Sequence, residues 1–137
     1  DEFRSKLGLG DFLIRNILGM DPSSGAIAIG ELPREGQQVQ FHIRDSRTSG
    51  EELEGLLKLH ADDHDSHPEC GALLFSCLGR GEYLYGHADH DTNLFEKWLG
   101  KMPLGGFFCN GEIGPVGNST FLHGYTSSFA LMRPRSQ

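Results

Sequence analysis

Two cysteines and an arginine stand where apolar segments of the chain end, and these side chains offer its clearest chemistry. Cys77 closes an apolar run at residues 71–77, and Arg80 follows in a turn flanked by glycines. Cys109 closes a second apolar run at residues 103–109. A thiolate beside a cation can act as a nucleophile, and two thiols can exchange. An arginine beside the N–H groups of glycine turns can instead hold a small carboxylate or phosphate.

The turn that follows Cys109 adds further polar groups. Residues 105–115 are apolar, then polar, then interrupted by glycine and proline, which predicts a buried strand that ends in a sharp turn at the rim of a sheet. Open sheets hold ligands at such rims. We therefore predict a ligand-binding rim, which His123 or Tyr125 can reach from the last apolar run, and its eight residues are Cys77, Arg80, Cys109, Asn110, Gly111, Glu112, His123 and Tyr125.

Each of these residues also has a structural explanation. Free cysteine is among the most buried residue types. Core packing is therefore a better explanation of Cys77 than a chemical role, whereas for Cys109 the two explanations are equally good. Glu112 can accept N–H bonds from the turn that follows it. Known nucleophile-elbow, P-loop, dinucleotide and C-x-x-C motifs are absent from the sequence. The sequence therefore predicts no catalytic residue, and a thiol-dependent enzyme that uses Cys109 is an alternative requiring a lowered thiol pKa.

A βαβ unit is needed to bring the two cysteines together. Residues 71–77 have the length of a central strand, residues 82–86 form a short extended piece, and residues 92–99 place apolar side chains on one helical face. Residues 103–109 then return as a second strand. Strands joined in this way run parallel and end at the same edge, so Cys77 and Cys109 are expected to be neighbours.

The rest of the chain predicts antiparallel strands and one more helix. Residues 12–20 and 26–30 form a hairpin around a D-P-S-S-G turn. Residues 38–44 alternate strictly, which predicts a third strand of a meander with His42 facing water. Residues 49–52 have the form of a capping box for a helix that runs to residue 60.

The final apolar run, residues 120–132, is long enough for one full-width strand. Together these elements predict a mixed α/β fold. Its single mixed sheet of about six strands combines the N-terminal antiparallel meander with a βαββ segment, and the two main helices pack on it.

A segment rich in histidine and acidic residues raises the question of a metal site. Its spacing matches no pattern of ligands with a required geometry, and such loops between elements are commonly solvated. We therefore predict no metal ligands among its residues, which are His60, Asp62, Asp63, His64, Asp65, His67, Glu69 and Cys70.

Composition excludes some classes of binding partner and favours a reducing compartment. The 137 residues fit one domain, and 12 basic against 19 acidic residues give a net charge of −7 without a basic cluster. Nucleic acid and anionic membranes are therefore poor partners. Three cysteines, no signal peptide and no apolar run of membrane length predict the cytoplasm or another reducing compartment, including a plastid stroma. The chain begins at Asp1 without methionine, so we expect one domain of a longer protein.

Four separated blocks resemble the C-terminal domain of the FIST family, and the likeness spans about residues 3–134. These blocks are Asp-Phe-Leu-Ile-Arg-Asn at 11–16, Leu-Phe-Ser-Cys-x-Gly-Arg-Gly at 74–81, Gly-Phe-Phe-Cys-Asn-Gly-Glu-Ile-Gly-Pro-Val at 106–116 and Phe-Leu-His-Gly-Tyr-Thr at 121–126. Four blocks in the right order are far more specific than any one of them.

The resemblance implies a non-catalytic sensory module of signal-transduction proteins that binds a small molecule such as an amino acid, and it allows haem as a cofactor. FIST domains usually come as an N-terminal and a C-terminal half. The resemblance therefore implies that residues 1–137 are the second half, whose partner is an N-terminal FIST half or another protein. A protein-interaction or scaffold role in a larger assembly is the alternative.

Overall fold

The centre of the fold is the strand β3 (Gly71–Cys77), which has a neighbour on each side. On one side it pairs in parallel with β4 (Leu104–Cys109), and on the other it pairs antiparallel with β7 (Ser127–Met132). The computed structural model describes residues 12–63, 69–116 and 118–135. The continuous apolar run that predicted a central strand is confirmed, as is the parallel pairing.

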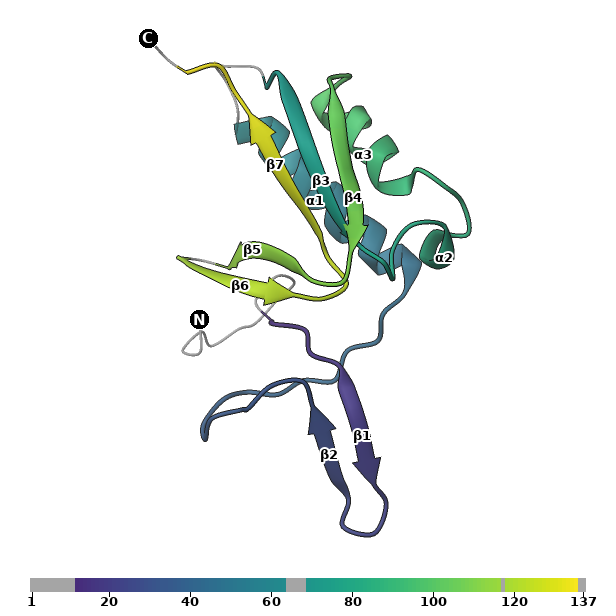
Figure 1. Cartoon of the computed structure of the whole chain (residues 1–137), viewed down its shortest axis with the longest axis vertical. Coiled ribbons are helices and arrows are strands. Elements are labelled where there is room, and N and C mark those ends of the chain that lie inside the picture. Colours follow the sequence, from purple (N-terminus) through teal and green to yellow (C-terminus); the bar gives the residue numbers. More distant parts are fainter. Residues whose placement is uncertain (1–11, 64–68, 117, 136–137) are drawn as a thin grey trace.

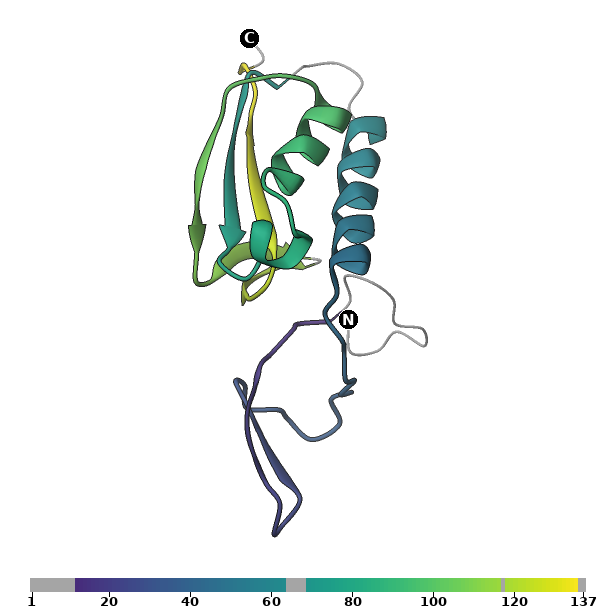
Figure 2. The same ribbon diagram turned by 90° about the vertical axis from the view of Figure 1, so that its right-hand side faces the viewer.

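Two helices cover one face of this three-stranded sheet (Figure 2). They are α1 (Ser46–Asp63) and α3 (His90–Leu99). Phe95 of α3 is fully buried, and its ring stacks on that of Phe129 at a centroid distance of 5.4 Å. The buried core is completed by Leu53, Leu57 and Ala72. The helices predicted at residues 50–60 and 92–99 thus form and pack on the sheet as expected.

The remaining strands form two separate hairpins (Figure 1). One hairpin lies next to the sheet, and the N-terminal hairpin projects away from it. The hairpin β5 (Glu112–Val116) and β6 (Ser119–His123) lies at the carboxyl end of β4. The N-terminal hairpin of β1 (Ile17–Asp21) and β2 (Ala26–Ile29) closes around the predicted turn, where Asp21 accepts hydrogen bonds from Ser23 and Ser24. The mixed α/β class is confirmed. The expected single sheet is replaced by three sheets of two, three and two strands in the described residues.

Two predicted strands are wrong, each for its own reason. Residues 38–44 form no strand and are largely exposed, with Ile43 at 92% of its full exposure, because the described residues supply neither a partner strand nor a surface for the apolar face. His42 is exposed as predicted, with its ring edge against Phe12 at 4.8 Å. The run at 120–132 is not one strand, because Tyr125 adopts a positive φ of 64° and turns the chain between β6 and β7.

Smaller differences concern turns and helix ends. Residues 82–85 form a short helix, α2 (Glu82–Tyr85), instead of an extended piece, since Gly81 and Gly86 take positive φ angles on either side of it. Helix α1 begins before the predicted capping box, because the Asp45 carboxylate accepts bonds from the Thr48 N–H and hydroxyl, both at 2.8 Å.

The run at 105–115 turns sharply as predicted, but its strand is not buried on both faces as expected. Strand β4 is an edge strand, and Phe107 is 64% exposed instead of buried on both sides. The chain turns at Asn110 and Gly111 and then continues as β5, in which Pro115 is tolerated because this two-stranded hairpin has free edges.

Candidate functional site

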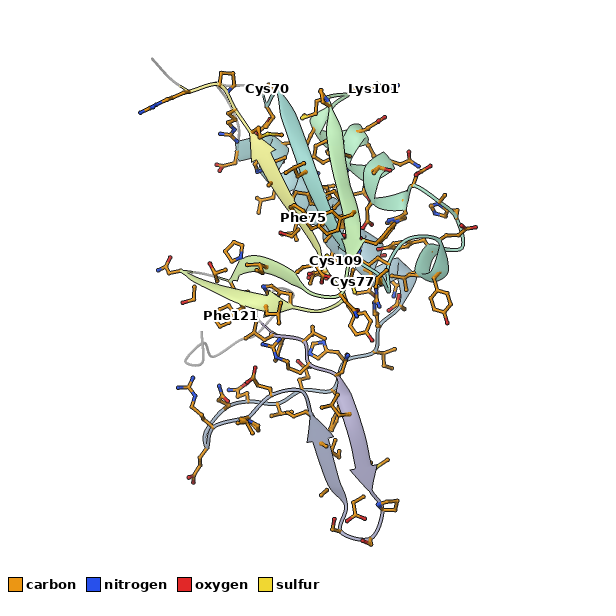
Figure 3. The ribbon with its side chains drawn as sticks, viewed as in Figure 1. Cys70, Phe75, Cys77, Lys101, Cys109 and Phe121 are labelled. Carbon is orange, nitrogen blue, oxygen red and sulfur yellow. The ribbon has the colours of Figure 1, made fainter. Side chains whose placement is uncertain are left out.

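The parallel strands bring the two predicted thiols together. Cys77 and Cys109 are register partners at the carboxyl ends of β3 and β4, and both are free thiols. Figure 3 shows them side by side, at the opposite end of the sheet from Cys70 and Lys101. Cys77 is buried, as core packing requires.

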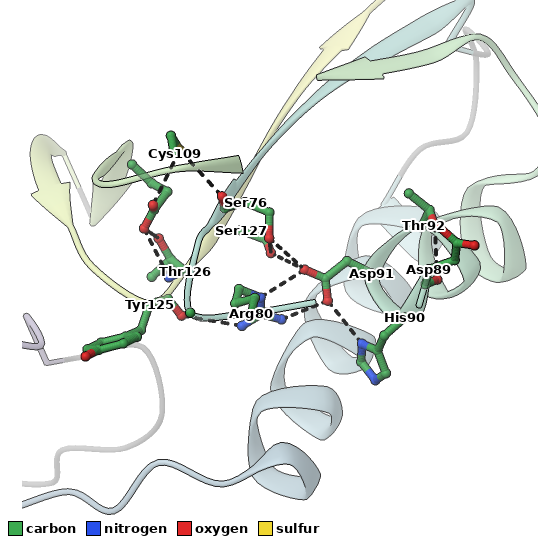
Figure 4. A network of polar contacts seen from close by, with 12 residues as sticks. Ser76, Arg80, Asp89, His90, Asp91, Thr92, Cys109, Tyr125, Thr126 and Ser127 are labelled. Carbon is green, nitrogen blue, oxygen red and sulfur yellow. Dashed lines mark hydrogen bonds and ion pairs between the residues drawn. The ribbon is translucent and has the colours of Figure 1, made fainter. Parts of the chain in front are cut away.

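Arg80 turns back into the protein after β3 and pairs with Asp91 at the start of α3. Its Nε donates to Asp91 Oδ2 at 2.9 Å and its Nη2 donates to Oδ1 at 3.0 Å, in the two-point geometry that arginine and carboxylate favour. Only 6% of the Arg80 side chain and 7% of the Asp91 side chain are exposed. This pair, which the sequence interpretation missed, is the centre of the polar network in Figure 4.

The Asp91 carboxylate collects bonds from three further side chains. Ser76 Oγ donates to Oδ2 at 3.2 Å and Ser127 Oγ donates to it at 2.5 Å. His90 Nδ1 lies 3.0 Å from Oδ1. Burial alone would raise the pKa of Asp91, but the hydrogen bond and charge of Arg80 outweigh burial and lower that pKa to about 2. Asp91 therefore carries a stable negative charge that ties β3, β7 and α3 together.

The pKa of the Arg80 guanidinium shifts in the direction that this pair requires. Burial by itself would lower it, whereas the hydrogen bonds and charge of Asp91 raise it. Arg80 Nη1 also donates to the backbone oxygen of Tyr125 at 3.4 Å. With its donors directed to Asp91 and Tyr125, Arg80 holds the fold together from inside the protein.

Buried Glu112 and half-buried Cys109 form a second polar group beside this pair. Glu112 is 1% exposed, and its Oε2 accepts from the backbone N–H of Thr126 at 3.2 Å and from the Thr126 hydroxyl at 3.0 Å. The Cys109 thiol donates to Glu112 Oε1 at 3.5 Å. Burial and the bond to Glu112 raise the pKa of Cys109, which is opposite to the lowered pKa that a nucleophilic thiolate needs.

The other predicted residues surround this network. The ring of Tyr125 lies against the Arg44 guanidinium, at 4.1 Å from the ring centroid. Arg44, which was not among the predicted residues, also donates to the Gly79 carbonyl at 2.8 Å. His123 Nε2 contacts the Gly114 carbonyl at 3.0 Å within the hairpin, whereas Asn110 is exposed. The structure thus brings the predicted residues close together, and it engages most of them with one another or with the backbone.

An open pocket lies on the other side of Asp91, against strand β4. Its volume is about 540 Å³, and its lining comes from β3, from the segment 81–92 and from β4. Leu74, Leu104 and Phe108 give it apolar walls, while Ser76, Asp89 and Asp91 give it polar groups. It runs along β4 from Leu104 to Phe108 and reaches the start of the following helix, and concave sites with apolar walls and a few polar groups commonly bind ligands.

Glycine at position 106 is what lets this wall form. Gly106 has a φ of 150°, and a Cβ there would lie 1.9 Å from the Leu74 backbone oxygen. No side chain can be accommodated at this position. The sequence interpretation treated Gly105 and Gly106 only as part of a strand and assigned no role at the site to Asp91. The adjacent glycines and the acidic residues at the helix start were the available signals.

The described residues contain no group of three metal-ligating side chains. His60 and Glu69 contact each other at 3.2 Å in the segment that raised the metal question. His64, Asp65 and His67 of that segment lie outside the described residues. In the described part of the chain, no helix has the length and apolar character needed to cross a bilayer.

Comparison with known proteins gives one family and several relatives. The model of the FIST C domain family matches residues 3–115. An uncharacterized protein of Mycobacterium tuberculosis is 47% identical over 131 residues, covering 96% of this chain and 34% of the relative. An uncharacterized protein of Mycobacterium bovis is 44% identical over 131 residues, which again cover 96% of this chain and 34% of the relative. Human F-box only protein 22 is 26% identical over 106 residues, covering 66% of this chain and 25% of the relative. The chain therefore spans about a third of the length of its mycobacterial relatives.

Proposed function

The chain belongs to the FIST C domain family, which is associated with sensory functions in signal transduction, and from this membership we propose that it is a non-catalytic, small-ligand-binding sensory domain. The observation that carries the proposal is the pocket of about 540 Å³ that lies along β4, beside β3 and the segment 81–92. This volume falls within the range of small-molecule sites, which is roughly 300–1,000 Å³. Apolar walls with a few converging polar groups are the usual lining of such sites.

The polar network offers a route by which ligand binding in the pocket could affect the rest of the domain. Asp91 lines the pocket, and the same carboxylate holds Arg80 and the Ser127 hydroxyl of β7. A ligand that contacts Asp91 therefore acts on a group shared by two strands and a helix. In this proposal, Arg80 and Glu112 position the pocket and the β5–β6 hairpin from behind the wall, and the ligand meets the residues in front of it.

A binding measurement on the two-half protein tests this proposal. Isothermal titration calorimetry against amino acids and haem should give saturable heat with at least one of them. Ala88→Trp fills the pocket from an exposed lining position and should abolish that heat. Asn93→Trp is the matched control, because Asn93 is exposed on α3 and does not line the pocket. Absence of binding in the wild-type protein, or equal binding by the Ala88→Trp variant, would rule out this site.

A second candidate is an assembly role, supported by the sheet face opposite the helices (Figure 2). Phe107 and Phe75 are register partners with their rings 5.2 Å apart, and Phe107 is 64% exposed. Leu73 and Met132 are 39% and 45% exposed. Because the mycobacterial relatives extend well beyond the matched region, we propose that an N-terminal FIST half covers this apolar face.

Separate expression of the two halves tests this assembly. Co-purification of the N-terminal half with the wild-type chain is expected, and Phe107→Ser combined with Leu73→Ser should weaken it. Tyr83→Ser is the control, since Tyr83 is an even more exposed aromatic residue, at 94%, but lies on α2. Retention of the complex by the double variant would place the interface elsewhere.

A further inference from the structure

From the charge and shape of the pocket beside β4, we infer that its ligand is an organic cation: a positively charged nitrogen group joined to a flat apolar body. This inference rests on the proposed function, because it concerns the same pocket. It goes further in naming the chemical class that the pocket accepts.

The ionisable side chains that line the pocket are three carboxylates and one histidine, His90. Glu82, Asp89 and Asp91 bring carboxylates to the lining, which contains neither lysine nor arginine. Arg80 neutralises Asp91 from the protein side of the wall and is not itself part of the lining. Glu82 and Asp89 therefore leave the pocket with a negative potential that attracts cations and repels anions.

Asp89 is the carboxylate most available to a ligand. It is exposed, and although it occupies the N-cap position of α3, its side chain makes no capping bond. Among the described residues its carboxylate has no hydrogen-bond or ion-pair partner, whereas Asp91 is held on both oxygens. A cationic nitrogen in the pocket could bond to Asp89 without displacing an existing contact.

The walls beside these carboxylates suit a flat apolar group. The Phe108 ring lies close to Gly81, where an added Cβ would meet the ring at 3.0 Å. Leu74 and Leu104 are further apolar lining residues, and Gly105 and Gly106 leave that part of the wall without side chains. An aromatic face near carboxylates also favours cations through the ring quadrupole.

The N-terminus of α3 would ordinarily favour an anion instead. Here Asp89 stands at its N-cap position and Asp91 in its first turn, so negative charge from the chain already occupies that end. A phosphate or carboxylate ligand would have to approach these groups against repulsion. The positive end of the helix therefore does not reverse the charge preference of the pocket.

Three indole compounds with the same ring and different charge test the inference: tryptamine (+1), tryptophan (zwitterion, 0) and indole-3-propionate (−1). Binding is measured by isothermal titration calorimetry to the longest natural polypeptide that contains this chain. Tryptamine should bind at least about tenfold more tightly than indole-3-propionate, because Coulomb attraction at a partly solvated site differs by this order or more. The preference should shrink as ionic strength rises.

Removing the carboxylate isolates the cause. Asp89→Asn should reduce tryptamine affinity by about threefold to tenfold and leave indole-3-propionate unchanged or slightly tighter. Glu35→Gln removes one negative charge at an exposed position outside the pocket and should change neither affinity.

The outcomes separate the two proposals. Equal binding of the three compounds, or tighter binding of indole-3-propionate, would overturn charge selection while leaving ligand binding at this pocket intact. Binding of none of them, with Ala88→Trp also without effect on amino acids and haem, would overturn the pocket itself and the inference with it.

Discussion

Replacing Asp91 by asparagine should destabilise the protein strongly, because the change leaves the Arg80 guanidinium buried without its counter-ion. Asparagine has almost the same shape and can still bond to Ser76 and Ser127, so the variant mainly removes charge. Breaking a buried ion pair from one side typically costs about 3–5 kcal/mol. The lowered pKa of Asp91 points in the same direction: its shift from 3.8 to about 2 corresponds to roughly 2 kcal/mol of stabilisation of the charged carboxylate.

Equilibrium urea unfolding measures the effect as a loss in the free energy of unfolding. The matched control is Glu51→Gln, which removes the exposed i,i+4 pair with Arg47 on α1 and should cost less than about 0.5 kcal/mol. Adding Arg80→Met to Asp91→Asn should recover at least about 1 kcal/mol, because the unpaired buried charge is then gone. A loss below about 1 kcal/mol for Asp91→Asn, or no recovery in the double variant, would refute the role given to this pair.

Three further outcomes follow from the same geometry. Because the folded-state pKa of Asp91 is lowered, the contribution of its charge to the free energy of unfolding is present above about pH 4 and is lost as pH falls toward 2. Unfolding measured as a function of pH should therefore show about 2 kcal/mol more acid destabilisation in the wild-type protein than in Asp91→Asn. Gly106→Ala should cost several kcal/mol in thermal unfolding, while Gly55→Ala in α1, with open space around it, should stabilise by about 0.5–1 kcal/mol; equal effects would contradict the close approach to Leu74. At pH 8, Cys109 should react with iodoacetamide more slowly than exposed Cys70, as followed by mass spectrometry of peptides, and faster labelling of Cys109 would contradict its raised pKa.

Much of the central sheet could be predicted from the sequence, because its signals are local. The apolar run at β3, the one-face pattern of α3 and their order along the chain imply a parallel βαβ unit. That topology alone places Cys77 beside Cys109, and the observed register agrees. The predicted proximity of the two strand ends is thus confirmed.

The errors arise where the outcome depends on a partner distant in sequence. Alternation at residues 38–44 indicates a face to be buried, yet the described residues offer nothing to bury it against. The break at Tyr125 depends on Glu112, which binds the neighbouring Thr126 from another strand. Similarly, Arg80 was predicted to hold an external anion because the sequence does not show that Asp91 folds back to satisfy it.

The Arg80–Asp91 pair also has a consequence for local motion. It joins the exit of β3 to the entrance of α3, so the ten residues 81–90 form a closed loop whose two ends are fastened by a buried contact. Opening that loop alone would expose two charges and leave the rest of the core intact, which makes partial unfolding there unfavourable. Backbone amides hydrogen-bonded within the loop, such as those of Tyr85 and Gly86, should therefore exchange with solvent deuterium as part of the central sheet, despite their place on the surface.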